Sequence, residues 1–127
     1  MARELNMNGN VKLKTIMKEF NDRFPHIRLS IYASSERTKN SKTPLHFDKT
    51  ISEVREKKSA DPAIIRGGQK VSNLEKMIDK TFGLYCQVAY SDNSGNYFTS
   101  GKLDDMSLRE VNAYGETQGW IKDKWHI

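Results

Sequence analysis

Few side chains in this 127-residue sequence have the types and spacing that catalysis or metal binding requires. Asp104 and Asp105 form a carboxylate pair, and Asp92 lies shortly before them. Such groups can bind a divalent cation or act as general acid and base. Asp105, however, stands two residues before a predicted helix start at Ser107, where a carboxylate stabilises the positive end of the helix dipole. We therefore interpret the pair as structural and keep an enzyme acting through the three aspartates as the weakest hypothesis.

The remaining candidate chemistry lacks partners. His26, His46 and His126 lie in three different segments, and Cys86 is the single cysteine, so the sequence shows no converging set of metal ligands. The glycine pair within residues 66–70 precedes a helix but lacks the spacing of a nucleotide-binding loop. No serine occupies a nucleophile elbow. We predict no catalytic, cofactor-binding or metal-binding residues, and hence a protein that is not an enzyme.

Positive charge is concentrated in the first half of the chain. Residues 11–70 carry 14 Lys or Arg against 7 Asp or Glu, whereas residues 71–127 carry 6 against 8. A basic strand and loop with an aromatic side chain can contact an acidic partner or single-stranded nucleic acid. The sequence shows no RNP-like aromatic motif, and a solvated charged loop is the competing interpretation. The residues for such a contact are Arg28, Tyr32, Arg37, Lys39, Lys42, Lys57 and Lys58.

The elements that must position these residues follow a pattern that occurs twice. Residues 70–112 repeat residues 12–55 at an offset of 57 or 58 positions, in pattern more than in identity. Such a repeat indicates two similar structural units. Helix-like Ile16, Phe20 and Phe24 match Leu74, Ile78 and Phe82. Strand-like Ile27, Leu29, Ile31 and Ser34 match Leu84, Cys86, Val88 and Ser91.

Apolar periodicity and turn residues predict the elements of each copy. The first copy is expected to hold a strand at 4–8, a helix at 12–24, a strand at 27–31, a polar loop at 34–43, a short strand at Leu45 and Phe47, and a short helix after a capping box at Thr50–Glu53. The second is expected to hold a strand at 63–66, a helix from a capping box at Ser72–Glu75 to a C-cap at Gly83, a strand at 84–88, a turn at 92–96, a returning strand at 97–99, and a capping box at Ser107–Glu110.

These elements predict an α+β fold. We expect a single domain over residues 1–127, built of two tandem βαββα-type repeats at about 3–58 and 61–113, with a C-terminal tail over 114–127. The repeats would share one core, with antiparallel hairpins and helices packed on sheet. Residues 3–68 also read βαββαβ, so a ferredoxin-like core with a C-terminal extension is the alternative.

The predicted tail holds both tryptophans of the chain. A free terminus frays unless it is held in place, and two tryptophans would be unusual on such a segment. The tail either packs on the protein's own sheet or docks on a partner or a second copy. Its docking residues would be Trp120, Ile121 and Trp125.

The second half contains several short motifs of turn, cap and core residues. They are Val71-Ser72-Asn73-Leu74-Glu75-Lys76, Phe82-Gly83-Leu84, Gln87-Val88, Ser94-Gly95-Asn96 and Asp105-Met106-Ser107-Leu108. On these motifs, the sequence resembles a family of small uncharacterised bacterial proteins of the Bacteroidetes type. The resemblance covers most of residues 64–112 and, more faintly, 12–55. It brings no catalytic or binding residues.

Together these features favour a protein–protein interaction or assembly module without cofactors, with a homodimer as one form. A nucleic-acid-binding module that uses the basic first repeat is the alternative. The single cysteine, the lack of a signal-peptide pattern and the lack of a long apolar run favour the cytoplasm and no membrane partner.

Overall fold

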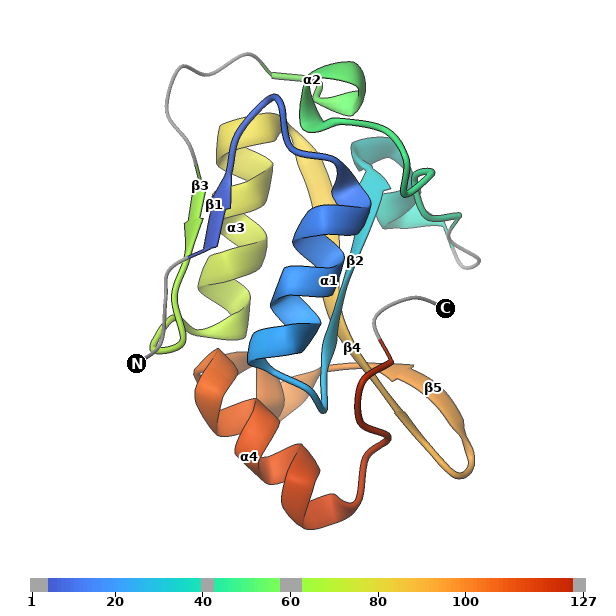
Figure 1. Ribbon diagram of the computed structural model, residues 1–127, viewed down its shortest axis with the longest axis vertical. Coiled ribbons are helices and arrows are strands. Elements are labelled where there is room, and N and C mark those ends of the chain that lie inside the picture. Colours follow the sequence, from blue (N-terminus) through green and yellow to red (C-terminus); the bar gives the residue numbers. More distant parts are fainter. Residues whose placement is uncertain (1–4, 40–42, 58–62, 125–127) are drawn as a thin grey trace.

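The computed structural model describes residues 5–39, 43–57 and 63–124. They form an α+β structure with antiparallel sheets and helices packed against them, as the sequence predicts (Figure 1). The elements in chain order, with η for 3-10 helices, are β1 (Leu5–Met7), α1 (Leu13–Arg23), β2 (Arg28–Ala33), η1 (Ser34–Thr38), α2 (Ile51–Val54), β3 (Ala63–Ile65), α3 (Val71–Phe82), β4 (Leu84–Asp92), β5 (Gly95–Phe98), η2 (Gly101–Asp105) and α4 (Leu108–Gln118).

The described strands form two separate sheets. β1 pairs with β3, and β2, β4 and β5 form a three-stranded sheet with β4 in the centre; all pairs are antiparallel. A ferredoxin-like core would place its four strands in one sheet, so that alternative is wrong.

Both sheets join the two halves of the chain at matching positions. Asn6 lies opposite Ile64 at the centre of the β1–β3 pair, and Ser30 lies opposite Gln87 within the β2–β4 pair. These partners are the residues that the sequence alignment equates, at offsets of 58 and 57. In the β1–β3 pair and in the β2–β4 pair, a residue therefore lies opposite the position that the alignment equates with it.

Helices α1 and α3 lie side by side against the three-stranded sheet (Figure 1). Their apolar stripes are buried because residues three and four positions apart share one helix face. The core combines both halves: Leu13, Ile16 and Phe20 of α1, Leu29 and Ile31 of β2, Val71, Leu74, Ile78 and Phe82 of α3, and Leu84, Cys86 and Val88 of β4. Each such large side chain contributes about 1.5–3 kcal/mol through burial.

Backbone bonds hold the first residues of α1 to the segment that precedes α2, and the first residues of α3 to the segment that precedes α4. The N–H group of Leu13 donates to the carbonyl of Lys49 at 2.8 Å, and the N–H group of Val71 donates to the carbonyl of Met106 at 3.1 Å. An isolated bridge joins Lys12 to Thr50, and its counterpart joins Lys70 to Ser107. Hydrogen-bond donors that a helix start leaves free are thus satisfied by backbone.

Two of the three predicted capping boxes are confirmed. Thr50 and Glu53 bond reciprocally at the start of α2, and Ser107 and Glu110 do so at the start of α4. The box predicted at Ser72 is wrong. Helix α3 begins at Val71, and its N-cap Lys70 makes no side-chain cap bond, because the backbone there already pairs with the Ser107 segment.

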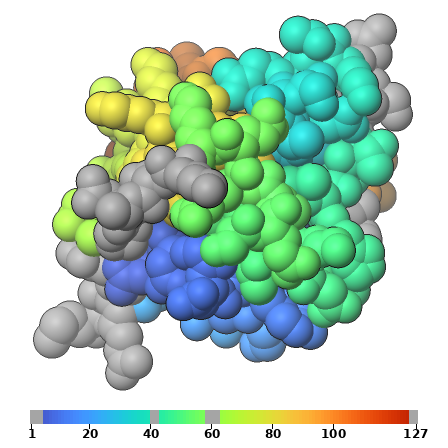
Figure 2. Space-filling view, turned by 90° about the horizontal axis from the view of Figure 1, so that it is seen from above, coloured from blue at the N-terminus to red at the C-terminus, as the bar shows by residue number. Residues whose placement is uncertain are grey.

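The α2 segment ties the first-half turn to the end of α3. Ser52 donates from its N–H to the carbonyl of Gly9 at 2.9 Å, while the N–H groups of Glu56 and Lys57 donate to the carbonyl of Phe82 at 2.9 and 3.0 Å. Figure 2 shows this segment in green between the blue N-terminal part and yellow α3. Backbone N–H groups of the first half therefore satisfy the carbonyl of Phe82 at the end of a helix in the second half.

The second strand predicted at Leu45 and Phe47 is not found. Leu45 makes one bond, from its N–H to the carbonyl of Ile31 at 3.0 Å, but residues 43–46 have no strand assignment. The second half does form its returning strand, β5. The physical difference is the tight turn, where the Asp92 carboxylate accepts from the N–H groups of Ser94 and Gly95 at 2.8 and 3.1 Å.

The sequence places the boundary between repeat and tail at residue 114, and helix α4 runs across this position. Helix α4 continues to Gln118 and ends at Gly119, which adopts the left-handed conformation with φ of 76°. Gly115 lets the ring of Trp120 pack closely on the helix, because a Cβ at this position would collide with Cε3 of that ring. No helix in the described part of the chain has the length and apolar character needed to cross a membrane.

Candidate interaction surface

The basic residues singled out in the sequence do not form one exposed patch in the described structure. Arg28 and Tyr32 are buried, with 2% and 1% of their surface exposed. The Nη1 atom of Arg28 donates to Oγ of Ser91 at 2.6 Å, and burial lowers the pKa of this guanidinium. Their alternation along β2 predicted an exposed face, but both faces of β2 are covered.

Two other members of this set, Arg37 and Lys39, form ion pairs. Arg37 pairs with Asp79 at 3.3 Å, and its guanidinium lies 4.9 Å from the ring centre of Tyr85. Lys39 pairs with Glu36. Lys57 is exposed, and its backbone closes the end of α3. Lys42 and Lys58 lie outside the described residues.

The aspartates that were candidates for catalysis have structural contacts. Asp92 accepts from the N–H and hydroxyl groups of Ser94 at 2.8 and 2.7 Å, and these bonds lower the pKa of the Asp92 carboxyl. Asp104 accepts from Oγ1 of Thr99 at 3.1 Å, and Asp105 ends η2. Within the described ranges, no group of three His, Cys, Asp or Glu side chains could hold a metal ion.

Glu75 of α3 is a perturbed acidic group that the sequence did not reveal. Burial, followed by repulsion from Asp104, raises the pKa of Glu75 to about 7, although the N–H of Val88 and the charge of Arg37 act in the opposite direction. In the sequence, Glu75 looked like a capping residue of Ser72. The residues that raise its pKa are distant in sequence, so no local signal identifies it.

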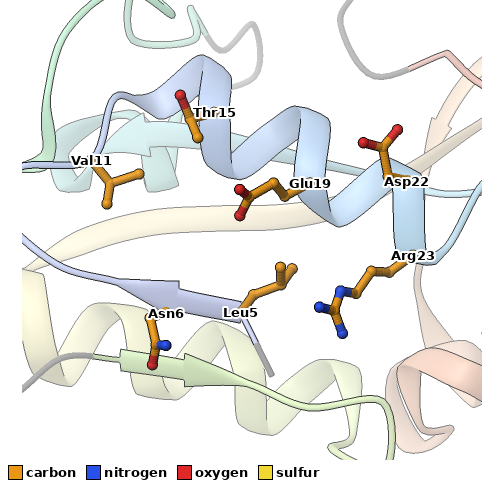
Figure 3. A pocket seen from close by; sticks show the side chains of 7 residues that line it. All are labelled: Leu5, Asn6, Val11, Thr15, Glu19, Asp22 and Arg23. Atoms are coloured by element: carbon orange, nitrogen blue, oxygen red, sulfur yellow. The ribbon is translucent and has the colours of Figure 1, made fainter. Parts of the chain in front are cut away.

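A cleft of ≈ 490 Å³ opens between β1 and α1 (Figure 3). Its polar groups are the carboxylates of Glu19 and Asp22 and the guanidinium of Arg23, and its lining contains Thr15 but no His or Cys. The lining residues are Leu5, Asn6, Val11, Thr15, Glu19, Asp22 and Arg23.

Aromatic rings form a continuous row across β5, β4, the C-terminal segment and α4. The ring centres of Tyr97 and Tyr90 are 5.5 Å apart, those of Tyr90 and Trp120 are stacked at 3.8 Å, and those of Trp120 and Tyr114 meet edge to face at 5.7 Å. Trp120 is 7% exposed, whereas Tyr97 and Tyr114 at the two ends are 41% and 42% exposed. The row is fixed in its centre and accessible at both ends.

Tyr97 belongs to a strand whose outer edge carries no partner among the described residues. β5 is the last strand of its sheet, and Asn96, Tyr97 and Phe98 are exposed. Natural edge strands are usually protected by charged side chains, proline or a covering segment, but β5 reads Gly-Asn-Tyr-Phe. We call Asn96, Tyr97 and Phe98 together with Tyr114 the aromatic edge.

The C-terminal segment packs on the protein itself as far as it is described. Trp120 belongs to the core, and its N–H donates to the carbonyl of Gly115 at 2.9 Å. Ile121 donates from its N–H to the carbonyl of Ser91 at 2.8 Å, with a side chain that is 41% exposed. Trp125 lies outside the described residues.

No family model, curated protein or solved structure matches this chain. A function is therefore inferred from the surfaces described above.

Proposed function

We propose that the chain is a non-enzymatic protein–protein interaction module whose contact surface is the aromatic edge. The observation that carries this proposal is the outer edge of β5, with which no strand of the described residues pairs, together with exposed aromatic side chains at Tyr97 and Phe98. An extended segment of another protein can add to such an edge through main-chain hydrogen bonds, while side chains provide selectivity. Aromatic residues are enriched in the cores of protein interfaces.

The rigidity of the aromatic row supports the same function. Tyr90 and Trp120 hold the row by stacking at 3.8 Å, and Trp120 is anchored in the core. A partner that binds Tyr97 therefore meets a ring whose neighbours are already ordered. Pre-ordered aromatic anchors reduce the entropy lost on association.

Nucleic-acid binding has less support. Of the residues expected to contact nucleic acid, Arg28 and Tyr32 are buried, and Arg37 and Lys39 form ion pairs. Titration with labelled single-stranded and double-stranded oligonucleotides at two salt concentrations tests this alternative, because phosphate binding weakens as salt rises.

We also infer that the module arose by duplication of one unit and acts in the cytoplasm. The matched registers and helix starts support the duplication. Cys86 is buried and unpaired, which suits a reducing compartment.

A pull-down tests the proposed function. The full chain is immobilised and exposed to native lysate of its source cells, and retained proteins are quantified by mass spectrometry. We expect Tyr97→Lys to reduce specific retention at least tenfold, roughly the effect of losing an interface hot spot. Phe47→Lys is the matched control, because Phe47 is 43% exposed but lies outside the aromatic edge. Retention that is absent in the wild type, or equal in both variants, would contradict the proposal.

A further inference from the structure

The hydrogen-bond pattern of the hairpin determines which backbone groups of β5 face outward. The N–H of Thr99 donates to the carbonyl of Val88 at 2.9 Å. Bonded and non-bonded pairs alternate along an antiparallel ladder, and Tyr97 lies opposite Tyr90. Tyr97 and Gly95 therefore direct their N–H and C=O groups toward β4. Asn96 and Phe98 direct theirs toward the open edge.

The outward N–H and C=O groups of one β5 strand can pair with the same groups of a second β5 strand. Asn96 and Phe98 lie on either side of Tyr97, so an antiparallel copy of β5 with Tyr97 opposite Tyr97 places each Asn96 opposite Phe98 of the other copy. Both pairs can then exchange N–H and C=O groups, which satisfies all the outward groups of Asn96 and Phe98. We propose that the partner of the aromatic edge is a second copy of this chain, joined through β5 across a twofold axis at Tyr97.

The side chains of β5 fit this arrangement. Directly opposed residues of an antiparallel pair place their side chains on the same face, so the two Tyr97 rings would meet at the axis. The row of Tyr97, Tyr90 and Trp120 would then continue from one copy into the other. β5 itself contains no charged residue, and the ammonium group of Lys124 next to it donates to Oδ1 of Asn96 at 3.1 Å. The hairpin projects away from α1 and α3 (Figure 1), which leaves room for a second copy beside it.

The chain already uses this mode of pairing internally. The β1–β3 and β2–β4 pairs are antiparallel and place equivalent positions opposite each other, Asn6 with Ile64 and Ser30 with Gln87. On the other edge of the three-stranded sheet, the N–H of Leu45 bonds to Ile31 of β2. Pairing through β5 would produce a six-stranded antiparallel sheet in which β5 of each copy is no longer an edge strand.

This inference rests on the proposed function and narrows it to self-association. Sedimentation velocity of the full chain, from about 1 µM to about 1 mM, covers the weak affinities expected of a small interface. We expect a monomer–dimer equilibrium in the wild type. Phe98→Pro removes one outward N–H without removing a bond to β4, and Tyr97→Lys places two charges at the axis. Each is expected to weaken the dimer at least tenfold.

Two controls separate pairing from other effects. Phe98→Ala removes the same ring as Phe98→Pro but keeps the N–H, and it should retain more of the dimer than the proline variant. Phe47→Lys alters a residue that is 43% exposed and lies outside the aromatic edge, and it should leave the dimer unchanged. Circular dichroism verifies that each variant is folded.

Amide hydrogen exchange followed by NMR reports on the edge directly. At high protein concentration, the N–H groups of Asn96 and Phe98 should gain protection, while those of Gly95 and Tyr97, already bonded to β4, should change little. A wild-type monomer at every concentration, or a dimer that Phe98→Pro leaves intact, would overturn the inference. In either case, retention of another protein that depends on Tyr97 would leave the proposed function standing.

Discussion

Residues from several elements act on the pKa of the Glu75 carboxyl, and burial is the largest cause of its rise. It lies on α3, accepts from the N–H of Val88 on β4, and feels the charges of Asp104 on η2 and Arg37 on η1. Thr99 lies beside this group and contacts both the carbonyl of Val88 and the carboxylate of Asp104 at 3.1 Å. Ionisation of Glu75 therefore places a second negative charge in a partly desolvated region between α3 and η2.

The pH dependence of stability follows from this environment. The pKa of Glu75 is about 7 in the folded chain against an ordinary value of 4.5, so the folded state holds its proton more tightly than the unfolded state. The resulting stabilisation is complete below pH 4.5 and is lost as the pH rises through about 7. The shift corresponds to roughly 3 kcal/mol, and solvent screening reduces the expected effect to roughly 1–2 kcal/mol.

We predict that Glu75→Gln makes the chain more stable than the wild type at pH 8 by roughly 1–2 kcal/mol, with little difference at pH 5. Glutamine keeps an oxygen that accepts from Val88 but cannot ionise. Urea denaturation of both chains at the two pH values measures the difference. Equal free energies of unfolding at pH 8 would show that Glu75 ionises without cost.

Sequence patterns at single residues predicted burial better than exposure. The apolar positions expected inside, such as Phe20, Leu29 and Cys86, are buried. Arg28 and Tyr32 were expected at the surface because polar residues alternate with apolar ones in β2. The second face of β2 is also covered, through contacts such as the Tyr32–Phe98 ring pair at 6.4 Å, and residues distant in sequence make these contacts.

At the scale of elements, side-chain capping boxes mark the starts of α2 and α4. Ser107 accepts from the N–H of Glu110 at 3.1 Å, and the N–H of Ser107 donates to the Glu110 carboxylate at 3.0 Å. The same exchange occurs between Thr50 and Glu53. Ser72 has the same sequence signature but lies inside α3. A capping signature therefore stabilises a helix only where its Ser or Thr occupies the N-cap position.

We predict that Ser107→Ala lowers the free energy of unfolding by about 1 kcal/mol, because it leaves a helix-terminal N–H without its acceptor. Ser72→Ala is the matched control and should be neutral or slightly stabilising, since alanine is the better residue within a helix. Thermal and urea unfolding of the two variants measure both effects. A larger loss for Ser72→Ala than for Ser107→Ala would contradict the assignment of the caps.

Most elements could be predicted because their signals are local. The apolar stripes of α1 and α3, the glycine that ends α3 and the tight turn at Asp92 are all visible in the sequence. The missing strand near Leu45 and the extension of α4 to Gln118 could not be predicted in this way. The tight turn that leads into β5 is a local feature of the second half, whereas the close approach of Trp120 to Gly115 is a tertiary contact that no local pattern reveals.

At the scale of the whole molecule, each half completes the other. Among the described strands, β1 pairs with β3 and β2 pairs with β4, so each of the two sheets contains strands from both halves. The α2 segment closes the end of α3, and Asn112 of α4 accepts from the N–H of His26 at 2.9 Å after α1. The sequence predicted a shared core but not this strand pairing, because periodicity marks a buried face without naming its partner strand.

This exchange of contacts predicts how the chain responds to division. Residues 1–58 and 61–127, produced separately, should each be largely unfolded, because each loses its cross-half strand pairs and would bury little surface at about 60 residues. Equimolar mixing should restore helical far-UV circular dichroism and a cooperative thermal transition, with the intact chain as the reference. Mixing either fragment with itself is the control. A second-half fragment that melts cooperatively by itself would show that the β4–β5 hairpin and α3 form a stable unit without β2, and the shared core would then be dispensable for folding.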